Sequence, residues 1–465
     1  MSTPLQSNLA AGSAVVVGLG RTGASAVRHL LARGLRVAVT DSREDPPGRA
    51  LLADSVGQVT VRTGGFDAAL LDGAAMVVLS PGVAPVGSFF DAVRARGIVL
   101  LGDIELFARA VRAPVAAITG TNGKSTVTTL LTHMAQRCAL TVRAGGNLGV
   151  PALELLAPAV QLYVLELSSF QLESTESLAL AAAAVLNVSA DHLDRYADVR
   201  SYAAAKARIF AHADVAVINQ DDPLVAAMPR AAQPRLSFSV SPAAAAAAPA
   251  AAAADYHLGP HPGQRSGSRA ADLWLMRRGE PLLALSELKI HGSHNAANAL
   301  AALALAEALA LPRAPCLAAL REFPGLAHRM QRVTEIRGVR YIDDSKGTNV
   351  GATLAAVAGL TATLIVIAGG QGKGQDFEPL RAAFAGKVRC ALLIGRDARA
   401  LGAALAGVCE CVYCSTLEEA VTRAAGLARP GEVVLLSPAC ASLDMFRDYA
   451  HRGEVFAEAV GRLAA

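Results

Sequence analysis

The stretch GTNGKST, residues 120–126, combines small residues with one lysine and two hydroxyl side chains. It follows the apolar run VAAIT and precedes TVTTLLTHMA, which is typical of a strand, a tight loop and a helix. Backbone N–H groups at such a helix N-terminus face phosphate oxygens. Lys124 would bridge the β- and γ-phosphates of a nucleotide, and Ser125 or Thr126 would offer a hydroxyl to Mg²⁺. The loop departs from the full P-loop pattern, because Ile118 stands where its first glycine would be.

Polar side chains follow two further apolar runs that would end near this loop. Glu166 ends LYVLE, and Asp191 and His192 come after AAAAVLNV. Ligands of open α/β sheets bind at the carboxyl ends of the strands, so we expect these side chains to converge with the loop. Together, the loop, the carboxylate and the imidazole predict a site for a nucleotide and Mg²⁺.

A glycine pattern near the N-terminus is a second candidate nucleotide-binding motif. Gly18, Gly20 and Gly23 form G-x-G-x-x-G after an apolar run, and Asp41 ends the next apolar run. Alone, this arrangement is typical of a domain that binds NAD or FAD. An NAD-dependent oxidoreductase is therefore one hypothesis, although it leaves GTNGKST and the later DDSKGTN unexplained. A nucleotide-binding switch protein without catalytic activity is another.

Short apolar strands alternate with helical stretches in three successive series along the 465 residues. We expect three consecutive α/β domains. Their predicted bounds are 1–102 for an N-terminal Rossmann-like domain, 103–325 for a central P-loop domain with a parallel sheet, and 326–465 for a C-terminal Rossmann-like domain. The Ala-, Pro- and Gly-rich stretch 241–269 is predicted to be an exposed, mobile excursion without chemistry.

Composition and charge narrow the function classes. The 43 basic and 39 acidic residues nearly balance, which gives no reason to propose nucleic acid as a partner. Apolar runs fall short of a membrane span, and the N-terminus lacks the pattern of a signal peptide, so we expect a cytoplasmic protein without membrane insertion. The seven cysteines are scattered along the sequence, so we expect them to be reduced thiols. Cys409, Cys411 and Cys414 cluster, but they lack a fourth ligand at zinc-site spacing.

Nine motifs in order resemble the Mur ligases, the ATP-dependent amide ligases of peptidoglycan precursor synthesis. They are GTNGKST, LELSSFQLE, NVSADHLDRY, SYAAAKARIF, GSHNAANALAALA, FPGLAHRM, DDSKGTN, GGQGKGQDF and SPACASLDMFRDYAHRGEVF. The resemblance covers the chain except 241–269 and implies a monomeric ligase that joins D-glutamate to UDP-N-acetylmuramoyl-L-alanine through an acyl phosphate. Members that add L-alanine, a diamino acid, a dipeptide or polyglutamate are the alternatives. The diamino-acid ligases carry a D-N-P-R-type motif, which this sequence lacks.

The resemblance also assigns the N-terminal glycine turn to the UDP of the substrate instead of a redox cofactor. It implies UDP contacts from Arg21 and Thr22 at the diphosphate, and from Asp41, Ser42, Arg43, Ser80 and Gly82 around uracil and ribose. Asn147 would contact the substrate near its muramoyl-alanine end.

For ATP, the resemblance implies contacts from Gly120, Thr121, Asn122, Gly123, Lys124, Ser125, Thr126, Asn295, Asn298, Arg329 and Asp344. Lys346 would reach the phosphates. D-glutamate would be recognised by Thr348, Lys373, Ser442 and the backbone around Tyr449.

Two Mg²⁺ ions are implied, one held by Ser125 and Glu166 and the other with His192 as a ligand. In the family, the lysine that corresponds to Lys206 carries a carbamate formed with CO₂ and supplies an anion to the second ion. Residue type alone would make Lys206 an ordinary helix-surface lysine. The catalytic roles would thus fall to Lys124, His192, Lys206 and Lys346.

Overall fold

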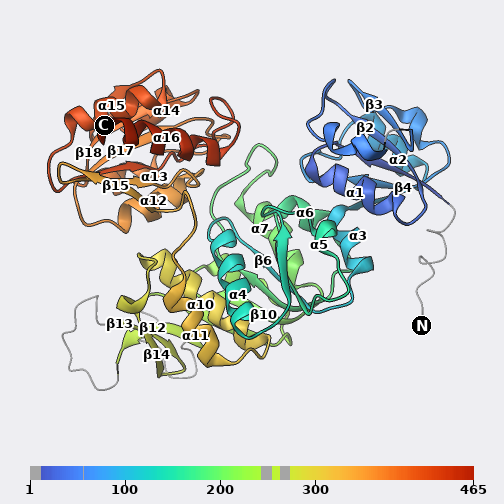
Figure 1. Cartoon of the computed structure of the whole chain (residues 1–465), viewed down its shortest axis with the longest axis horizontal. Helices are drawn as coiled ribbons and strands as arrows, with labels where there is room; N and C mark the ends of the chain where they lie inside the picture. Colours follow the sequence, from blue (N-terminus) through green and yellow to red (C-terminus); the bar gives the residue numbers. More distant parts are fainter. Residues whose placement is uncertain (1–11, 56, 242–253, 262–272, 465) are drawn as a thin grey trace.

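The structure is a computed structural model that describes residues 12–55, 57–241, 254–261 and 273–464. Its strands form three sheets of five, nine and six strands, each from one continuous part of the chain. Figure 1 shows the blue N-terminal, cyan-to-yellow central and orange-to-red C-terminal parts as three α/β bodies. The predicted class of three consecutive α/β domains is confirmed. Within the described ranges, no helix has the length and apolar character needed to cross a membrane.

The N-terminal sheet is entirely parallel, with strand order β3-β2-β1-β4-β5. Its elements are β1 (Ser13–Val17), α1 (Arg21–Leu31), β2 (Arg36–Asp41), β3 (Val59–Thr63), β4 (Ala74–Leu79), α2 (Ser88–Ala95) and β5 (Val99–Gly102). The connections diverge from β1 to β2 on one side and β4 on the other, which opens a ligand crevice at their carboxyl ends. A Cβ at Gly23 would lie 2.0 Å from the Gly18 carbonyl oxygen, so α1 can approach β1 this closely only with glycine there.

The central sheet has the order β14-β13-β12-β11-β10-β9-β6-β8-β7. Its strands are β6 (Val115–Thr119), β7 (Val142–Gly146), β8 (Leu162–Glu166), β9 (Leu180–Val185), β10 (Ala213–Asn219), β11 (Arg235–Ser239), β12 (Tyr256–Pro260), β13 (Leu273–Arg277) and β14 (Glu280–Ala284). The helices are α3 (Asp103–Ala110), α4 (Lys124–Arg137), α5 (Ala152–Leu155), α6 (Ser169–Glu173), α7 (Val199–Ala207), α8 (Pro223–Ala226), α10 (Ser293–Ala308) and α11 (Arg313–Glu322). The buried run of β6 lies between β8 and β9 and delivers the phosphate-loop motif to the carboxyl edge.

Strand β12 falls inside 241–269, so the prediction of an exposed excursion is wrong for this strand. Its Tyr256 is buried and donates its hydroxyl to Glu307 of α10. The strand pairs with β11 in parallel and with β13 in antiparallel register. The apolar alternation of Tyr256 and Leu258 is too short to stand out between Ala/Pro-rich and Gly/Ser-rich sequence. Residues 242–253 and 262–272 lie outside the described ranges, so the rest of that prediction is untested.

The C-terminal sheet has the order β15-β16-β20-β17-β18-β19, parallel except for the β15–β16 hairpin. Its elements are β15 (Gln331–Ile336), β16 (Val339–Asp343), α12 (Val350–Ala358), β17 (Leu364–Gly369), α13 (Pro379–Phe384), β18 (Val388–Ile394), α14 (Ala398–Ala404), β19 (Glu410–Tyr413), α15 (Leu417–Leu427), β20 (Val433–Leu436) and α16 (Tyr449–Ala464). The predicted parallel sheet of the central domain is present from β7 to β12, and antiparallel pairs at β12–β14 and β15–β16 make the second and third sheets mixed at one edge.

Candidate active site

The phosphate-loop motif turns tightly between β6 and α4. Gly123 has φ +86°, and a Cβ there would lie 2.4 Å from Oδ1 of Asn298 on α10, so the loop needs glycine at this contact. The Lys124 ammonium folds back over the loop and donates to the carbonyl oxygens of Gly120 and Thr121, at 2.9 Å each. Burial lowers the pKa of Lys124, and the carboxylates of Glu166 and Asp191 oppose that shift. The predicted strand–loop–helix arrangement is present.

Lys206 on α7 contacts the same loop. Its Nζ donates to the Gly120 carbonyl oxygen at 2.9 Å and lies 4.3 Å from the centre of the Tyr202 ring. The residue is only 1% exposed, so the expectation from residue type of a helix-surface lysine is wrong. Burial, reinforced by the positive charge of Lys124, holds the pKa of Lys206 well below its usual range. A desolvated amine with a depressed pKa is the nucleophilic form of lysine.

Glu166 lies at the end of β8 with one oxygen engaged and one free. Its Oε1 accepts a 2.7 Å hydrogen bond from Nδ2 of Asn147, whereas buried Oε2 has no hydrogen-bond partner in the described part of the chain. A buried, unpartnered carboxylate oxygen beside a phosphate loop fits a Mg²⁺ ligand. The other predicted ligand of that ion, the Ser125 hydroxyl, accepts a 3.0 Å hydrogen bond from Arg329 of the C-terminal domain.

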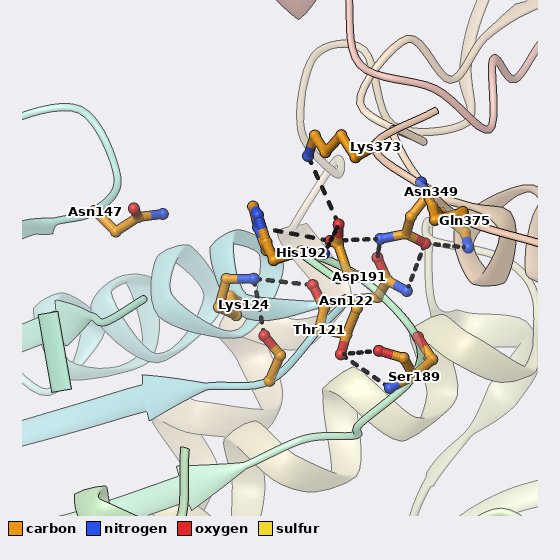
Figure 2. Close-up of polar contacts among 12 residues, drawn as sticks. Thr121, Asn122, Lys124, Asn147, Ser189, Asp191, His192, Asn349, Lys373 and Gln375 are labelled. Atoms are coloured by element: carbon orange, nitrogen blue, oxygen red, sulfur yellow. Dashed lines mark hydrogen bonds and ion pairs between the residues drawn. The ribbon is translucent and has the colours of Figure 1, made fainter. Parts of the chain in front are cut away.

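Asp191 is a buried carboxylate that lies beside His192 and Lys373. His192 Nε2 lies 3.8 Å from Asp191 Oδ2, and the ammonium of Lys373 lies 3.6 Å from Oδ1 (Figure 2). Burial alone would raise the pKa of Asp191, but Lys373, His192 and Lys124 outweigh it and lower that pKa. Burial also lowers the pKa of His192, which favours the neutral imidazole that binds metals. No three His, Cys, Asp or Glu side chains of the described ranges group as a metal cluster.

A cavity of about 340 Å³ adjoins the phosphate loop and is walled by both the central and the C-terminal domain. Its lining includes the predicted ATP contacts Asn122, Gly123, Thr126, Asn295, Asn298, Arg329, Asp344 and Lys346. Leu186 and Phe238 add apolar surface that residue types did not single out. The arrangement can hold a nucleotide whose phosphates point at the helix N-terminus of α4.

The side of the cavity formed by the C-terminal domain carries Asp344 and Lys346, whose pKa values are shifted toward each other. Burial raises the pKa of Asp344 to about 7. Burial, with the charge of Arg329, lowers the pKa of Lys346 to about 7. The Lys346 ammonium lies 3.6 Å from the centre of the Tyr449 ring, so a predicted phosphate contact and a predicted D-glutamate contact lie side by side. Charged phosphates entering the cavity would favour the protonated form of Lys346.

The predicted UDP contacts gather at the carboxyl edge of the N-terminal sheet. Asp41 accepts from the Leu19 backbone N–H at 2.6 Å and from the Arg43 guanidinium at 2.7 and 2.9 Å. Burial would raise the pKa of Asp41, but these hydrogen bonds lower it to about 2. Ser80 donates its hydroxyl to the Gly18 carbonyl oxygen at 2.7 Å and so joins β4 to the glycine turn. The remaining predicted contacts, Arg21, Thr22, Ser42 and Gly82, are exposed or half-buried.

Two side chains that sequence reasoning missed lie at or near the boundary between the central and C-terminal domains. Asn349 and Gln375 belong to the quoted motifs DDSKGTN and GGQGKGQDF, yet their types suggest no chemistry. Asn349 contacts Asn122 and Asp191 across the domain boundary, and Gln375 joins α12 to the loop that carries Lys373. Thr348 precedes Asn349 at the same boundary, whereas Ser442 is buried on the loop after β20.

Comparison with known protein families covers the three domains in the same order. Residues 12–102 match "Mur ligase MurD-like, N-terminal domain", 118–306 match "Mur ligase middle domain", and 328–440 match "Mur ligase, glutamate ligase domain". The chain belongs to the Mur ligase family. This Mur ligase is therefore ATP-dependent, which fits the phosphate loop and the cavity beside it.

Curated relatives of this Mur ligase align over nearly the whole chain. The UDP-N-acetylmuramoylalanine--D-glutamate ligase of Nitrosococcus oceani is 50% identical over 463 residues, covering 99% of this chain and 98% of the relative. The protein of the same name from Pseudomonas aeruginosa is 48% identical over 454 residues, covering 97% and 98%.

Solved structures with low identity share the fold of this Mur ligase. The UDP-N-acetylmuramate-alanine ligase of Thermotoga maritima superposes with a TM-score of 0.61 at 19% identity, covering 97% of this chain and 99% of that one. The MurF ligase of Thermotoga maritima, determined in complex with ADP, superposes with a TM-score of 0.57 at 16% identity, covering 97% and 96%.

Proposed function

We propose that this Mur ligase joins D-glutamate to UDP-N-acetylmuramoyl-L-alanine in an ATP-dependent reaction of peptidoglycan precursor synthesis. The proposal rests mainly on relatives named for this activity, to which the chain is 48–50% identical in sequence over nearly its full length. The site supports it, because a phosphate loop and a cationic C-terminal loop face each other across one boundary.

The chemistry has two steps. A carboxylate oxygen of the substrate's L-alanine attacks the γ-phosphorus of ATP, the bond from that phosphorus to the bridging oxygen breaks, and ADP leaves. The amine of D-glutamate then attacks the acyl carbon, phosphate leaves, the amine gives up a proton, and the amide remains. Two anions must meet in the first step, so Lys124, Lys346 and Arg329 would stabilise the developing charge.

The residues present fit Mg²⁺ and a carbamate. Ser125 and Glu166 would hold one ion, and His192 together with carbamylated Lys206 would hold the second. Mg²⁺ bound there would neutralise phosphate charge and align the acceptor carboxylate. For the carbamate, the neutral Lys206 amine would add to CO₂ with formation of an N–C bond and loss of one proton. The buried, depressed-pKa amine and the unpartnered Glu166 oxygen support this arrangement.

D-glutamate recognition would use Thr348, Lys373, Ser442 and the backbone around Tyr449, while Asn295, Asn298 and Asp344 would hold adenine and ribose. Asn147 would contact the muramoyl-alanine end, which is consistent with its place beside Glu166. The domain bounds 102/103 and 325/326, the monomeric state and the cytoplasmic location stay predictions.

The amino-acid specificity can be tested directly. We expect the purified protein to release ADP with UDP-N-acetylmuramoyl-L-alanine and D-glutamate at least about tenfold faster than with any other amino acid, because a missing ion pair or hydrogen bond costs about 1.5–3 kcal/mol. The measurement is coupled ADP release with a panel of L-alanine, L-glutamate, D-glutamate and a diamino acid. Equal or higher rates with another member of the panel would contradict the assignment.

The N-terminal glycine turn should bind UDP and not a nicotinamide cofactor. Arg21, Thr22, Asp41, Ser42, Arg43, Ser80 and Gly82 would surround UDP in the crevice of that sheet. We expect saturable binding of the UDP-muramoyl substrate by calorimetry, competed by UDP, and no specific binding of NADH in a fluorescence titration. Tight NADH binding that UDP competes poorly would return the turn to the redox-cofactor hypothesis.

A further inference from the structure

We propose that Asn349 is a positioning residue that fastens the D-glutamate-binding loop of the C-terminal domain to the phosphate loop of the central domain. The proposal rests on the proposed function and deepens it by naming the contact that couples the two loops. Asn349 is buried and stands at the N-terminus of α12, where that helix meets the central domain (Figure 2).

The Asn349 side-chain amide makes three hydrogen bonds across the boundary. Asn349 Nδ2 donates to Oδ1 of Asn122 at 3.1 Å, and Asn122 Nδ2 returns a hydrogen bond to Asn349 Oδ1 at 3.2 Å. The same Nδ2 donates to Oδ2 of Asp191 at 3.3 Å. Asn122 is itself part of the phosphate loop, and its backbone N–H is held by the Asn187 side chain at 2.8 Å. Asn349 therefore contacts both the ATP loop and the carboxylate that faces Lys373.

The same amide is tied to the loop that carries Lys373. Its Oδ1 caps α12 by accepting from the Ala352 backbone N–H at 2.9 Å. The next residue, Val350, donates its backbone N–H to Gln375 Oε1 at 2.9 Å, and Gln375 Nε2 donates to the Gly372 carbonyl oxygen at 2.9 Å. A shift of the first turn of α12 would therefore move the Lys373 loop as well. Asn349 can therefore influence D-glutamate binding through the position of the Lys373 loop, although it does not contact D-glutamate itself.

The first turn of α12 packs closely against the central domain at this point. A Cβ added to Gly351 would lie 3.1 Å from the Ser189 hydroxyl and 3.5 Å from Asn122 Nδ2. The start of α12 thus packs directly on two loops of the central domain. Polar groups desolvated in such a contact must stay paired, so the reciprocal amide pair specifies one arrangement of the two domains.

The test is Asn349→Asp, compared with Asn349→Ser. Aspartate and serine both keep an N-cap acceptor for α12. Aspartate loses the Nδ2 donor and places a carboxylate beside Asp191, whereas serine only removes the contacts. We expect kcat/KM for D-glutamate to fall about tenfold in Asn349→Asp and about threefold in Asn349→Ser, mainly through KM, because a net hydrogen bond corresponds to a few-fold change. Because Asn122 is also a predicted ATP contact, its effect is read at saturating ATP, where Asn122→Ala should raise the KM for D-glutamate no further in the Asn349→Ser background.

The controls separate positioning from folding. Circular dichroism should show that both Asn349 variants stay folded at the assay temperature, and Thr416→Asp, a carboxylate at the N-cap of α15 away from the central domain, should keep normal D-glutamate kinetics (Figure 1). Unchanged D-glutamate KM in Asn349→Asp, or additive effects of Asn122→Ala and Asn349→Ser on that KM at saturating ATP, would overturn the proposal. A wild-type protein that ignores D-glutamate would instead contradict the proposed function. The contact could then still be tested by small-angle scattering in the presence of an ATP analogue. Equal radii of gyration for the wild type and Asn349→Asp would overturn the proposal.

Discussion

Replacing Lys206 by alanine is expected to lower the rate of D-glutamate-dependent ADP release by about a hundred- to a thousandfold, the range for losing one preorganised charge-stabilising group. The proposed carbamate would supply an anion beside the phosphate loop, and alanine cannot form it. Lys124 still donates to the Gly120 carbonyl oxygen, so the loop keeps a partner in the variant. The measurement is steady-state ADP release at saturating substrates.

Chemical rescue and a matched control make that experiment specific. The space left by the buried side chain can admit a short carboxylic acid such as formate, which should restore part of the rate. Exposed Lys289 of the same domain offers a Lys→Ala control that should keep full activity. Circular dichroism must show that Lys206→Ala remains folded, because removing a buried side chain destabilises a core. A folded variant with near-normal turnover would refute the carbamate.

Replacing Lys373 by alanine should weaken the use of D-glutamate by about ten- to a hundredfold. A charge-assisted hydrogen bond in a closing cleft contributes about 1.5–3 kcal/mol, and about 1.4 kcal/mol corresponds to one decade. In the structure the Lys373 ammonium already lies 3.6 Å from Asp191, so a D-glutamate carboxylate would share this cation with Asp191. The KM for ATP and for the UDP substrate should change little. Kinetics with each substrate varied in turn provide the measurement.

Lys387 supplies the matched control for that substitution. It belongs to the same domain, and its ammonium donates to the Ala358 carbonyl oxygen at 3.2 Å, away from the boundary residues. Lys387→Ala should leave all three KM values unchanged. If Lys373→Ala raises the KM for ATP while the KM for D-glutamate stays constant, the lysine serves the nucleotide instead.

The parts of the site that sequence predicted correctly lie on buried parallel strands. Strands β6 and β8 read as continuous apolar runs, which locate GTNGKST and Glu166 at one edge. Residue type alone did not indicate the burial of Lys206, because α7 is rich in alanine and the carbonyl oxygen that the lysine contacts lies 86 residues away; only the motif resemblance assigned this lysine to the site. The Asn122–Asn349 pair joins residues 227 positions apart, and no sequence pattern of amide side chains predicts such a contact. Strand β12 was missed because its pattern is short.

The cavity beside the phosphate loop has walls from two domains, and this has a thermodynamic consequence. A nucleotide that touches both walls favours the arrangement in which they meet, and an amino acid held between the same domains favours it too. Reciprocity then requires that the factor by which ATP tightens D-glutamate binding equal the factor by which D-glutamate tightens ATP binding. The two affinities of this Mur ligase are linked quantities, so a substitution at the boundary that changes one coupling factor must change the other equally.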